Sequence, residues 1–373
     1  MAGIYVHIPF CRKACHYCNF HFSTNHRLMA GMMQAIREEA TIRKHYLTEK
    51  VETIYLGGGT PSLITGDEIR TTIDTLKELF IVDPGAEITL EANPDDISEG
   101  QLEAWDEAGI NRLSIGIQSF FEADLQWMNR AHSASQALAC IELAQQKGFY
   151  NLTIDLIYGT PGLTDANWLS NIETALAFNI PHVSCYALTV EPRTALAKRI
   201  AHQGAADIDP EMQANHFNLL IGRLKKAGFE HYEISNFALP GFRSRHNSSY
   251  WQGKPYLGLG PSAHSYNGKG RQWNIANNSL YLKSMEQGIV PFEEEILTET
   301  QKLNEYIMTA LRTMEGISLK HIGENWSNQL QQEIVTESKP HLGTGKLLLV
   351  NEQLVLSEAG RFFADGIAAD LFR

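Results

Sequence analysis

The strongest constraint on the fold of this chain is an alternation of short β-branched segments with longer amphipathic ones. The expected strands are Ile4–Ile8, Val51–Leu56, Glu87–Ala92, Arg112–Ile117, Leu152–Tyr158 and His182–Leu188, with a seventh over Tyr232–Phe237. The expected helices are Leu28–Tyr46, Asp67–Phe80, Ser98–Ala108, Ser135–Lys147, Ala166–Phe178 and Pro210–Ala227. This order predicts an α/β fold with a parallel sheet covered by helices. Six units are fewer than the eight of a closed barrel, so we expect an incomplete (β/α)6 barrel.

The composition changes after the barrel segment. Pro240–Arg271 is rich in Gly, Ser, His, Asn and aromatic residues, which predicts a long ordered loop with a functional role. Farther on, Glu299–Met314 predicts a helix, Lys346–Leu356 a hairpin and Glu358–Leu371 a last helix. We therefore expect a barrel over 1–239, an ordered loop region over 240–297 packed on it, and a smaller winged-helix-like helical domain over 298–373.

The overall charge is acidic, with 43 Asp and Glu against 31 Lys and Arg and a formal net charge of −12. An acidic surface repels phosphate backbones, so no nucleic-acid partner is expected. No run of 18 apolar residues predicts a membrane span, and the first residues lack the basic region of a signal peptide. We expect a cytoplasmic protein, in which clustered cysteines are more often ligands or catalysts than disulfides.

Three of the five cysteines fall within eight residues, directly after the first expected strand. Cys11, Cys15 and Cys18 have the spacing C-x3-C-x2-C. Three thiolates on a four-iron cluster leave one iron open for a cofactor. A zinc knuckle completed by His16 or His21, or three unconnected thiols, are the alternatives. The position favours a functional site, because active sites of α/β barrels lie at the carboxyl ends of the strands.

Glycines and polar residues recur at the ends of the following strands. Gly57-Gly58-Gly59-Thr60 ends the second strand, where glycines let a backbone approach a ligand or simply form a tight turn. Glu91 and Gln118 end the next two strands, Asp155 interrupts the otherwise apolar Leu152–Tyr158, and Arg130 follows a helix. Each alone has a structural explanation, such as a buried ion pair. Together they suit a zwitterionic amino acid joined to a ribose.

These residues together resemble the radical SAM superfamily. The resemblance is to the branch that contains oxygen-independent coproporphyrinogen III dehydrogenases and related haem chaperones. It rests on Gly3–Cys11, Gly57–Pro61, Ser114–Ser119 and Asp155–Pro161 together with the cysteine spacing. It implies a TIM-type partial barrel with the C-terminal helical domain of that branch.

The resemblance also implies the cofactors and their residues. Cys11, Cys15 and Cys18 would hold a [4Fe–4S] cluster, whose open iron would bind the methionine part of S-adenosylmethionine (SAM). The residues implied around SAM are Tyr5, Tyr17, Gly58, Gly59, Thr60, Glu91, Gln118, Arg130, Asp155 and Ala187.

Two departures separate the chain from the dehydrogenases of this branch. They carry a fourth cysteine two residues after the third, where this chain has Phe20, and a longer segment before the first strand. His246-Asn247-Ser248-Ser249-Tyr250-Trp251 resembles a motif HNxxYW linked to haem in the chaperones. His246, Tyr250 and Trp251 are therefore expected haem contacts, with His264 a second candidate. A hydrogen-bonded loop histidine beside core aromatics is the structural alternative.

Three functions are compatible with the resemblance. The first is a chaperone that binds haem and passes it to apo-haemoproteins, with those of the respiratory chain as the implied clients. The second is an oxidoreductase that decarboxylates coproporphyrinogen III, and a weaker third is a radical SAM enzyme with another substrate. Peripheral membrane contact and a homodimer are compatible with the sequence.

Overall fold

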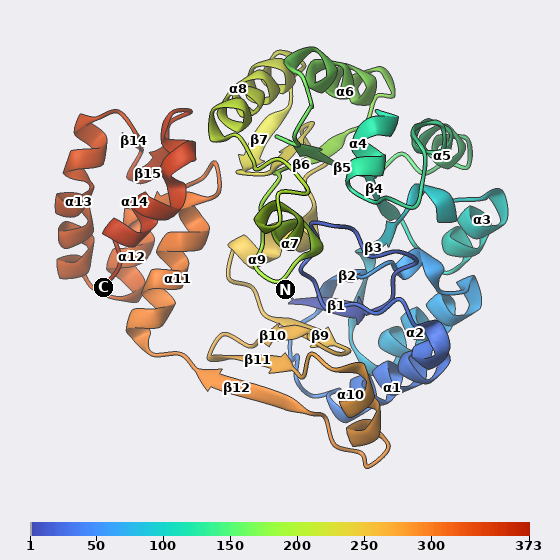
Figure 1. Ribbon diagram of the computed structural model, residues 1–373. Coiled ribbons are helices and arrows are strands. Elements are labelled where there is room, and N and C mark those ends of the chain that lie inside the picture. Colours follow the sequence, from blue (N-terminus) through green and yellow to red (C-terminus); the bar gives the residue numbers. More distant parts are fainter. Residues whose placement is uncertain (1) are drawn as a thin grey trace.

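Six parallel strands form the centre of the computed structural model, which describes residues 2–373 (Figure 1). They are β1 (Ala2–Ile8), β2 (Val51–Gly58), β3 (Val82–Ala92), β4 (Arg112–Gln118), β5 (Leu152–Tyr158) and β6 (His182–Ala187). They pair in chain order, each parallel to the next. Their near-continuous burial is typical of a parallel sheet covered on both faces. The incomplete (β/α)6 barrel predicted from the alternation is confirmed.

Helices cover the outer face of these strands (Figure 1). They are α1 (Met29–Ile42), α2 (Gly66–Leu79), α3 (Glu99–Glu107), α4 (Glu122–Trp127), α5 (Ala134–Gln146), α6 (Asp165–Ala177) and α8 (Pro210–Lys226). The short helix α7 (Ala195–Ala201) lies instead beside the loop that carries the clustered cysteines, where the Leu196 amide donates to the His16 carbonyl (2.8 Å). In α2, for example, Ile69, Ile73 and Leu76 share one buried face at helical spacing. The six expected helices are all present. The short helices α4 and α7 were not predicted, because six or seven residues give too few turns for a clear periodicity.

The barrel ends in a hairpin where the sequence predicted a single strand over Tyr232–Phe237, and that prediction is wrong. β7 (Glu230–Glu233) and β8 (Asn236–Ala238) are antiparallel, and β8 pairs with β6. The Glu233 carboxylate accepts hydrogen bonds from the Ser235 amide (3.0 Å) and the Asn236 side-chain amide (2.6 Å). These bonds fold the segment back on itself.

The long loop expected over Pro240–Arg271 is also a wrong prediction, because much of it is regular. It contains α9 (Arg245–Trp251), β9 (Tyr256–Leu259), β10 (His264–Tyr266) and the first residues of β11 (Gly270–Asn274). β9 pairs with the free edge of β1, and β10, β11 and β12 (Phe292–Ile296) extend the sheet beyond it. Strands of three to five residues that pair with an existing sheet edge need little β-propensity of their own. The composition of this segment therefore did not predict them.

A buried charged network attaches this sheet extension to the barrel. Glu39 of α1 and Arg43, the residue that follows this helix, form an ion pair (3.1 Å) with side chains 0% and 7% exposed. The Glu39 carboxylate also accepts hydrogen bonds from the Tyr281 hydroxyl (2.6 Å), in α10 (Asn278–Met285), and from the Asn274 side chain (2.8 Å). The Arg43 guanidinium donates to Gln272 of β11 (2.6 Å). Buried charges of this kind are tolerated only when fully paired.

The last part of the chain has its own core and lies beside the barrel, next to β7 and α8 (Figure 1). It consists of α11 (Glu299–Leu311), β13 (Ile317–Ser318), α12 (Leu319–Asn325), α13 (Asn328–Gly343), β14 (Leu347–Val350), β15 (Gln353–Leu356) and α14 (Ala364–Asp370). The expected hairpin is present as β14 and β15. Within residues 2–373, no helix is long and apolar enough to cross a membrane.

The Glu39–Arg43 pair gives a stability prediction. Arg43→Met leaves the Glu39 carboxylate buried without its cation, which costs roughly 3 kcal/mol. Urea unfolding followed by tryptophan fluorescence should show a lower midpoint. Lys225→Met, which breaks the exposed Lys225–Glu358 pair, is the matched control and should leave the midpoint unchanged. Equal midpoints for the two variants would contradict the role of the network.

Candidate functional site

The glycine segment at the end of β2 lies directly under the end of β1. The Gly59 amide donates to the Ile8 carbonyl (2.9 Å), and the Thr60 amide donates to the Phe10 carbonyl (2.7 Å). Gly58 has φ +109°, and a Cβ there would lie 2.6 Å from the His7 ring. Only glycine fits this close approach of two strand ends. This contact fixes where the cysteine loop, which follows β1 and carries Cys11, Cys15 and Cys18, begins relative to the glycine segment Gly57–Thr60.

The three motif cysteines follow β1 as half-buried free thiols that influence one another electrostatically. Burial raises the pKa of the Cys11 thiol to about 11, and Cys18 and Cys15 add to the effect. Over residues 2–373, no three His, Cys, Asp or Glu side chains are grouped to hold a single metal ion. A cluster binds each thiolate to a different iron, so its cysteines need not converge on one point. This donor set fits a [4Fe–4S] cluster.

Arg130 lies beside the cysteine loop with part of its guanidinium unpaired. Its Nη1 lies 3.4 Å from Cys15 Sγ, and its Nη2 donates to Asn93 Oδ1 and to the Gly116 carbonyl, both at 2.8 Å. Its buried Nε has no hydrogen-bond partner among the described residues. A buried N–H without an acceptor is costly, so the geometry fits an anionic ligand group at this point.

Two carboxyl groups project into the barrel from β3 and β5, the strands on either side of β4. The Glu91 carboxylate of β3 accepts hydrogen bonds from the Tyr55 hydroxyl (2.7 Å) and the Gly58 amide (3.1 Å). Burial raises the pKa of Glu91 to about 7 and that of Asp155, on β5, to about 6. Neighbouring Asp155 also contributes to the shift of Glu91. A cationic ligand would stabilise both carboxylates in their charged form.

Gln118 lies at the end of β4 in a left-handed conformation with φ +66°. Its side-chain amide and the Arg130 guanidinium both lie within about 3.1 Å of where a Cβ on Gly116 would stand. A register shift between β4 and β5 accompanies this conformation. Strain of this kind in a non-glycine residue is common at functional sites. The structure therefore brings Gln118 and Arg130 together.

The three remaining residues expected around SAM surround the same end of the barrel. Tyr5 on β1 forms a hydrogen bond between its hydroxyl and His7 Nδ1 (3.0 Å). Tyr17 is beside Cys15 and Arg130, and burial raises its pKa. Ala187 is exposed at the carboxyl end of β6 and pairs with Tyr158.

The motif histidine packs beside Tyr5, with the two ring centroids 6.4 Å apart. His246 in α9 is 1% exposed and stacks on Tyr55, with ring centroids 4.9 Å apart. Both ring nitrogens are engaged, one with the Thr53 hydroxyl and one with the Tyr250 hydroxyl, each at 2.8 Å. Glu87, in the middle of β3, accepts a hydrogen bond from the His246 amide (3.0 Å). Neither ring nitrogen is therefore available to a ligand in this arrangement.

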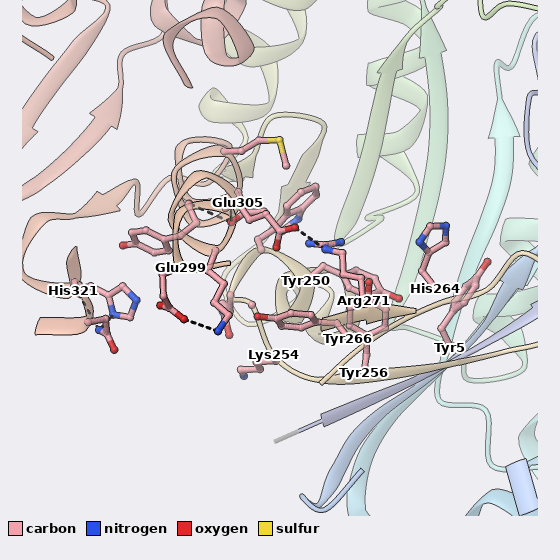
Figure 2. A pocket seen from close by; sticks show the side chains of 18 of the residues that line it. Tyr5, Tyr250, Lys254, Tyr256, His264, Tyr266, Arg271, Glu299, Glu305 and His321 are labelled. Carbon is pink, nitrogen blue, oxygen red and sulfur yellow. Dashed lines mark hydrogen bonds and ion pairs between the residues drawn. The ribbon is translucent and has the colours of Figure 1, made fainter. Parts of the chain in front are cut away.

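Tyr250 and Trp251 of the same motif line a cavity of about 860 Å³ that lies between the barrel, the sheet extension and the C-terminal domain (Figure 2). Many of its lining side chains are aromatic rings or imidazoles: Tyr5, His7, Phe20, His21, Tyr250, Trp251, Tyr256, His264, Tyr266, Tyr306, His321 and Trp326. This volume is within the range of small-molecule sites. Four of these residues, from Tyr5 to His21, belong to β1 or the cysteine loop. The cavity therefore adjoins the cysteine site.

Sequence reasoning missed the contribution of the C-terminal domain to this cavity. Tyr306, His321 and Trp326 come from α11, α12 and the residue after it, and their rings stack or lie edge-on to one another. Their only signal in the sequence was the helical spacing of α11, which indicates a buried face but not the surface it faces. Tyr55 and Asn93, which hold Glu91 and Arg130, were missed for the same reason.

Comparison with known sequences identifies the family. Residues 5–175 match the family model of the radical SAM superfamily, and residues 297–363 match the HemN C-terminal domain. The chain is 35% identical to the "Heme chaperone HemW" of Mycobacterium tuberculosis, over 99% of this chain and 94% of that protein. It is 33% identical to the protein of the same name from Bacillus subtilis, over 88% of each chain. The chain belongs to the HemW family of radical SAM proteins.

Family membership implies a [4Fe–4S] cluster and SAM, as the sequence predicted. A mitochondrial relative from Bos taurus, "Radical S-adenosyl methionine domain-containing protein 1", is 34% identical over 86% of this chain and 75% of its own length. The solved structure of coproporphyrinogen III oxidase (HemN) from Escherichia coli matches with a TM-score of 0.86 at 22% identity. That match covers 100% of this chain and 90% of that one, and it confirms the predicted fold.

The cysteine loop gives a prediction on cluster content. Anaerobic reconstitution should load about four irons per chain and produce a broad visible absorption. Cys15→Ala removes one thiolate ligand and should abolish both. Cys140→Ala, which changes a buried thiol in α5 outside the motif, should keep both. Full iron loading of Cys15→Ala, or zinc at full occupancy in native protein that accepts no cluster, would contradict the assignment.

The raised pKa of Glu91 gives a pH-dependent prediction. Because this pKa is about 7 in the folded chain and near 4.5 ordinarily, the folded state binds more protons between these values. The Glu91 contribution to stability therefore falls as pH rises from 4.5 to 7. Glu91→Gln removes this dependence, so its free energy of unfolding relative to wild type should rise by on the order of 3 kcal/mol across that window.

Urea unfolding at pH 4.5, 6 and 8 measures this difference. Subtracting the wild-type curve cancels the other titrating groups and any constant effect of the lost Gly58 hydrogen bond. A difference that stays flat with pH would show that Glu91 is charged in the unliganded protein.

Proposed function

We propose that this chain is a haem chaperone that holds a [4Fe–4S] cluster and SAM at the carboxyl end of its barrel and haem in the adjoining cavity. The observation that carries the proposal is the cavity of about 860 Å³, which shares Tyr5, His7, Phe20 and His21 with β1 and the cysteine loop. A large, flat and mostly apolar ligand suits aromatic walls of this kind. The names of the relatives from two bacteria support the choice of haem.

The geometry supports a role in this proposal for each residue expected at the cluster and SAM. Cys11, Cys15 and Cys18 hold the cluster. The Arg130 Nε and the Gln118 amide bind polar groups of SAM, while Glu91 and Asp155 face its positive charge. Gly58, Gly59 and Thr60 offer backbone to its amino-acid part, and Tyr5, Tyr17 and Ala187 border its remainder. A cluster of this kind supplies the electron that cleaves SAM to a radical.

Phe20 supports the chaperone over the dehydrogenase. It stands where the dehydrogenases of this branch have a fourth cysteine, and its ring is 68% exposed while lining the cavity. An exposed aromatic ring at a cavity wall is well placed to cover a bound macrocycle. Coproporphyrinogen decarboxylation is the second candidate, because a porphyrinogen is similar in size to haem and the cavity adjoins the SAM site.

The wider assignments belong to the same proposal. Haem is handed to apo-haemoproteins, with those of the respiratory chain as candidate clients, from a cytoplasmic location and with peripheral membrane contact during delivery. The proposed units are the barrel over 1–239, the segment over 240–297 and the C-terminal domain over 298–373. Pull-down of client proteins with haem-loaded chain and sedimentation analysis of its homodimer test these points.

One reconstituted sample separates the two candidate functions. Incubated anaerobically with SAM, reductant and coproporphyrinogen III, it should form no protoporphyrinogen, and the same sample should bind haemin with a Soret band. Product can be measured by liquid chromatography after oxidation to the porphyrin. Accumulation of protoporphyrinogen in wild type, but not in Cys15→Ala, would replace the chaperone with the dehydrogenase.

A further inference from the structure

The cavity wall contains four histidines that differ in the freedom of their ring nitrogens. Both nitrogens of His7 are engaged, by the Tyr5 hydroxyl and by the His21 carbonyl, each at 3.0 Å. His21 binds Asn278 through Nε2 (2.7 Å), and His321 binds Asn325 through Nδ1 (3.0 Å). The His264 side chain forms no hydrogen bond with any described residue and is exposed at the cavity wall. Its imidazole is therefore open to a ligand.

The position of His264 is rigid. β10 pairs with β11 so that His264 lies opposite Trp273, and the two rings stack with centroids 6.3 Å apart. The His264 backbone packs so closely on Gly258 that no side chain would fit at position 258. The next residue, Ser265, points to the other sheet face, where its hydroxyl accepts a hydrogen bond from Arg43 (3.2 Å). A metal ligand on a rigid strand is held in place before its metal arrives.

The same face of the β10–β11 hairpin carries the aromatic wall (Figure 2). Tyr266 is two residues from His264 on the same side of the strand. Its ring is 6.4 Å from Tyr256, which meets Tyr250 edge-on at 4.6 Å. The Arg271 guanidinium covers Tyr266 and pairs with Glu305 of α11 (2.8 Å), across the cavity. A planar ligand that enters along these rings meets an imidazole at the barrel end.

We infer that His264 is the iron ligand of haem bound in this cavity, and that His246 serves as a positioning residue. The inference rests on the proposed function and identifies which residue of the proposed haem site binds the iron. A neutral imidazole with an open nitrogen is a common axial ligand of haem iron. His246 has no open nitrogen, but its bond to the Tyr250 hydroxyl fixes a ring that lines the cavity.

The test compares histidine variants of the cluster-reconstituted chain with SAM bound. Ferric haemin is titrated in, and the Soret band and low-temperature electron paramagnetic resonance (EPR) of the haem report its ligand. His264→Ala should lose the histidine-type haem signal and weaken binding at least about tenfold, since even outer-shell partners change metal affinity that much. Free imidazole should restore the signal. His264→Met should give a signal distinct from both wild type and His264→Ala, because the donor atom changes.

Three further variants complete the comparison. His246→Ala and His321→Ala should keep the histidine-type signal, the first with weaker binding through the loss of Tyr250 positioning. His45→Ala, at an exposed position after α1, is the matched control and should behave as wild type. Circular dichroism and iron content check that each variant is folded and loaded.

The outcomes separate this inference from the function on which it rests. An unchanged histidine-type signal in His264→Ala, or its loss only in His321→Ala or His246→Ala, would overturn the ligand assignment while leaving a haem-binding chain. Wild type that binds no haemin would remove the proposed function and this inference with it. Loss of the signal in His264→Ala with rescue by imidazole establishes the ligand.

Discussion

The structure of this site depends on the close packing of the end of β1 against the glycine segment that ends β2. The hydrogen bonds from Gly59 to Ile8 and from Thr60 to Phe10 join the two strand ends, and a side chain at Gly58 would collide with His7. This contact sets the height of Cys11 above the sheet, and β2 in turn pairs with β3, which carries Glu91. The relative positions of the cysteine loop and the inward-facing carboxylates follow from this one backbone contact.

The interior of the barrel holds two carboxyl groups whose charge is opposed by burial. Glu91 and Asp155 have pKa values raised to about 7 and about 6, and Arg130 keeps a buried N–H without an acceptor. A chain selected for stability alone would replace such groups with apolar residues of similar size. Their polarity matches a ligand that brings both a cation and an anion. The two buried carboxyl groups and the unpaired Arg130 N–H together favour SAM in the barrel interior more strongly than any one of these residues does.

The sequence predicted the periodic parts of the fold and the residues at the strand ends. The six parallel strands, their main helices and the C-terminal hairpin each carry a local pattern, and Glu91, Gln118 and Asp155 stand out as polar residues in apolar strands. The sheet extension was missed, because β9 and β10 depend on a free β1 edge rather than on their own composition. The cavity was missed because its walls come from distant segments such as Tyr5, Tyr250 and Tyr306. The engaged state of His246 depends on Thr53, almost 200 residues earlier.

The placement of His246 changes how the HNxxYW segment acts. Its imidazole stacks on Tyr55, whose hydroxyl donates to Glu91, and its other partner is Tyr250 in the cavity wall. One continuous set of contacts therefore joins a carboxylate at the proposed SAM site to an aromatic ring at the proposed haem site. A buried residue with two hydrogen bonds holds its neighbours in place more effectively than it could bind a metal, because ligation would break one of those bonds at a cost of about 1–3 kcal/mol. The segment can thus be necessary for haem binding while the iron is ligated elsewhere in the cavity.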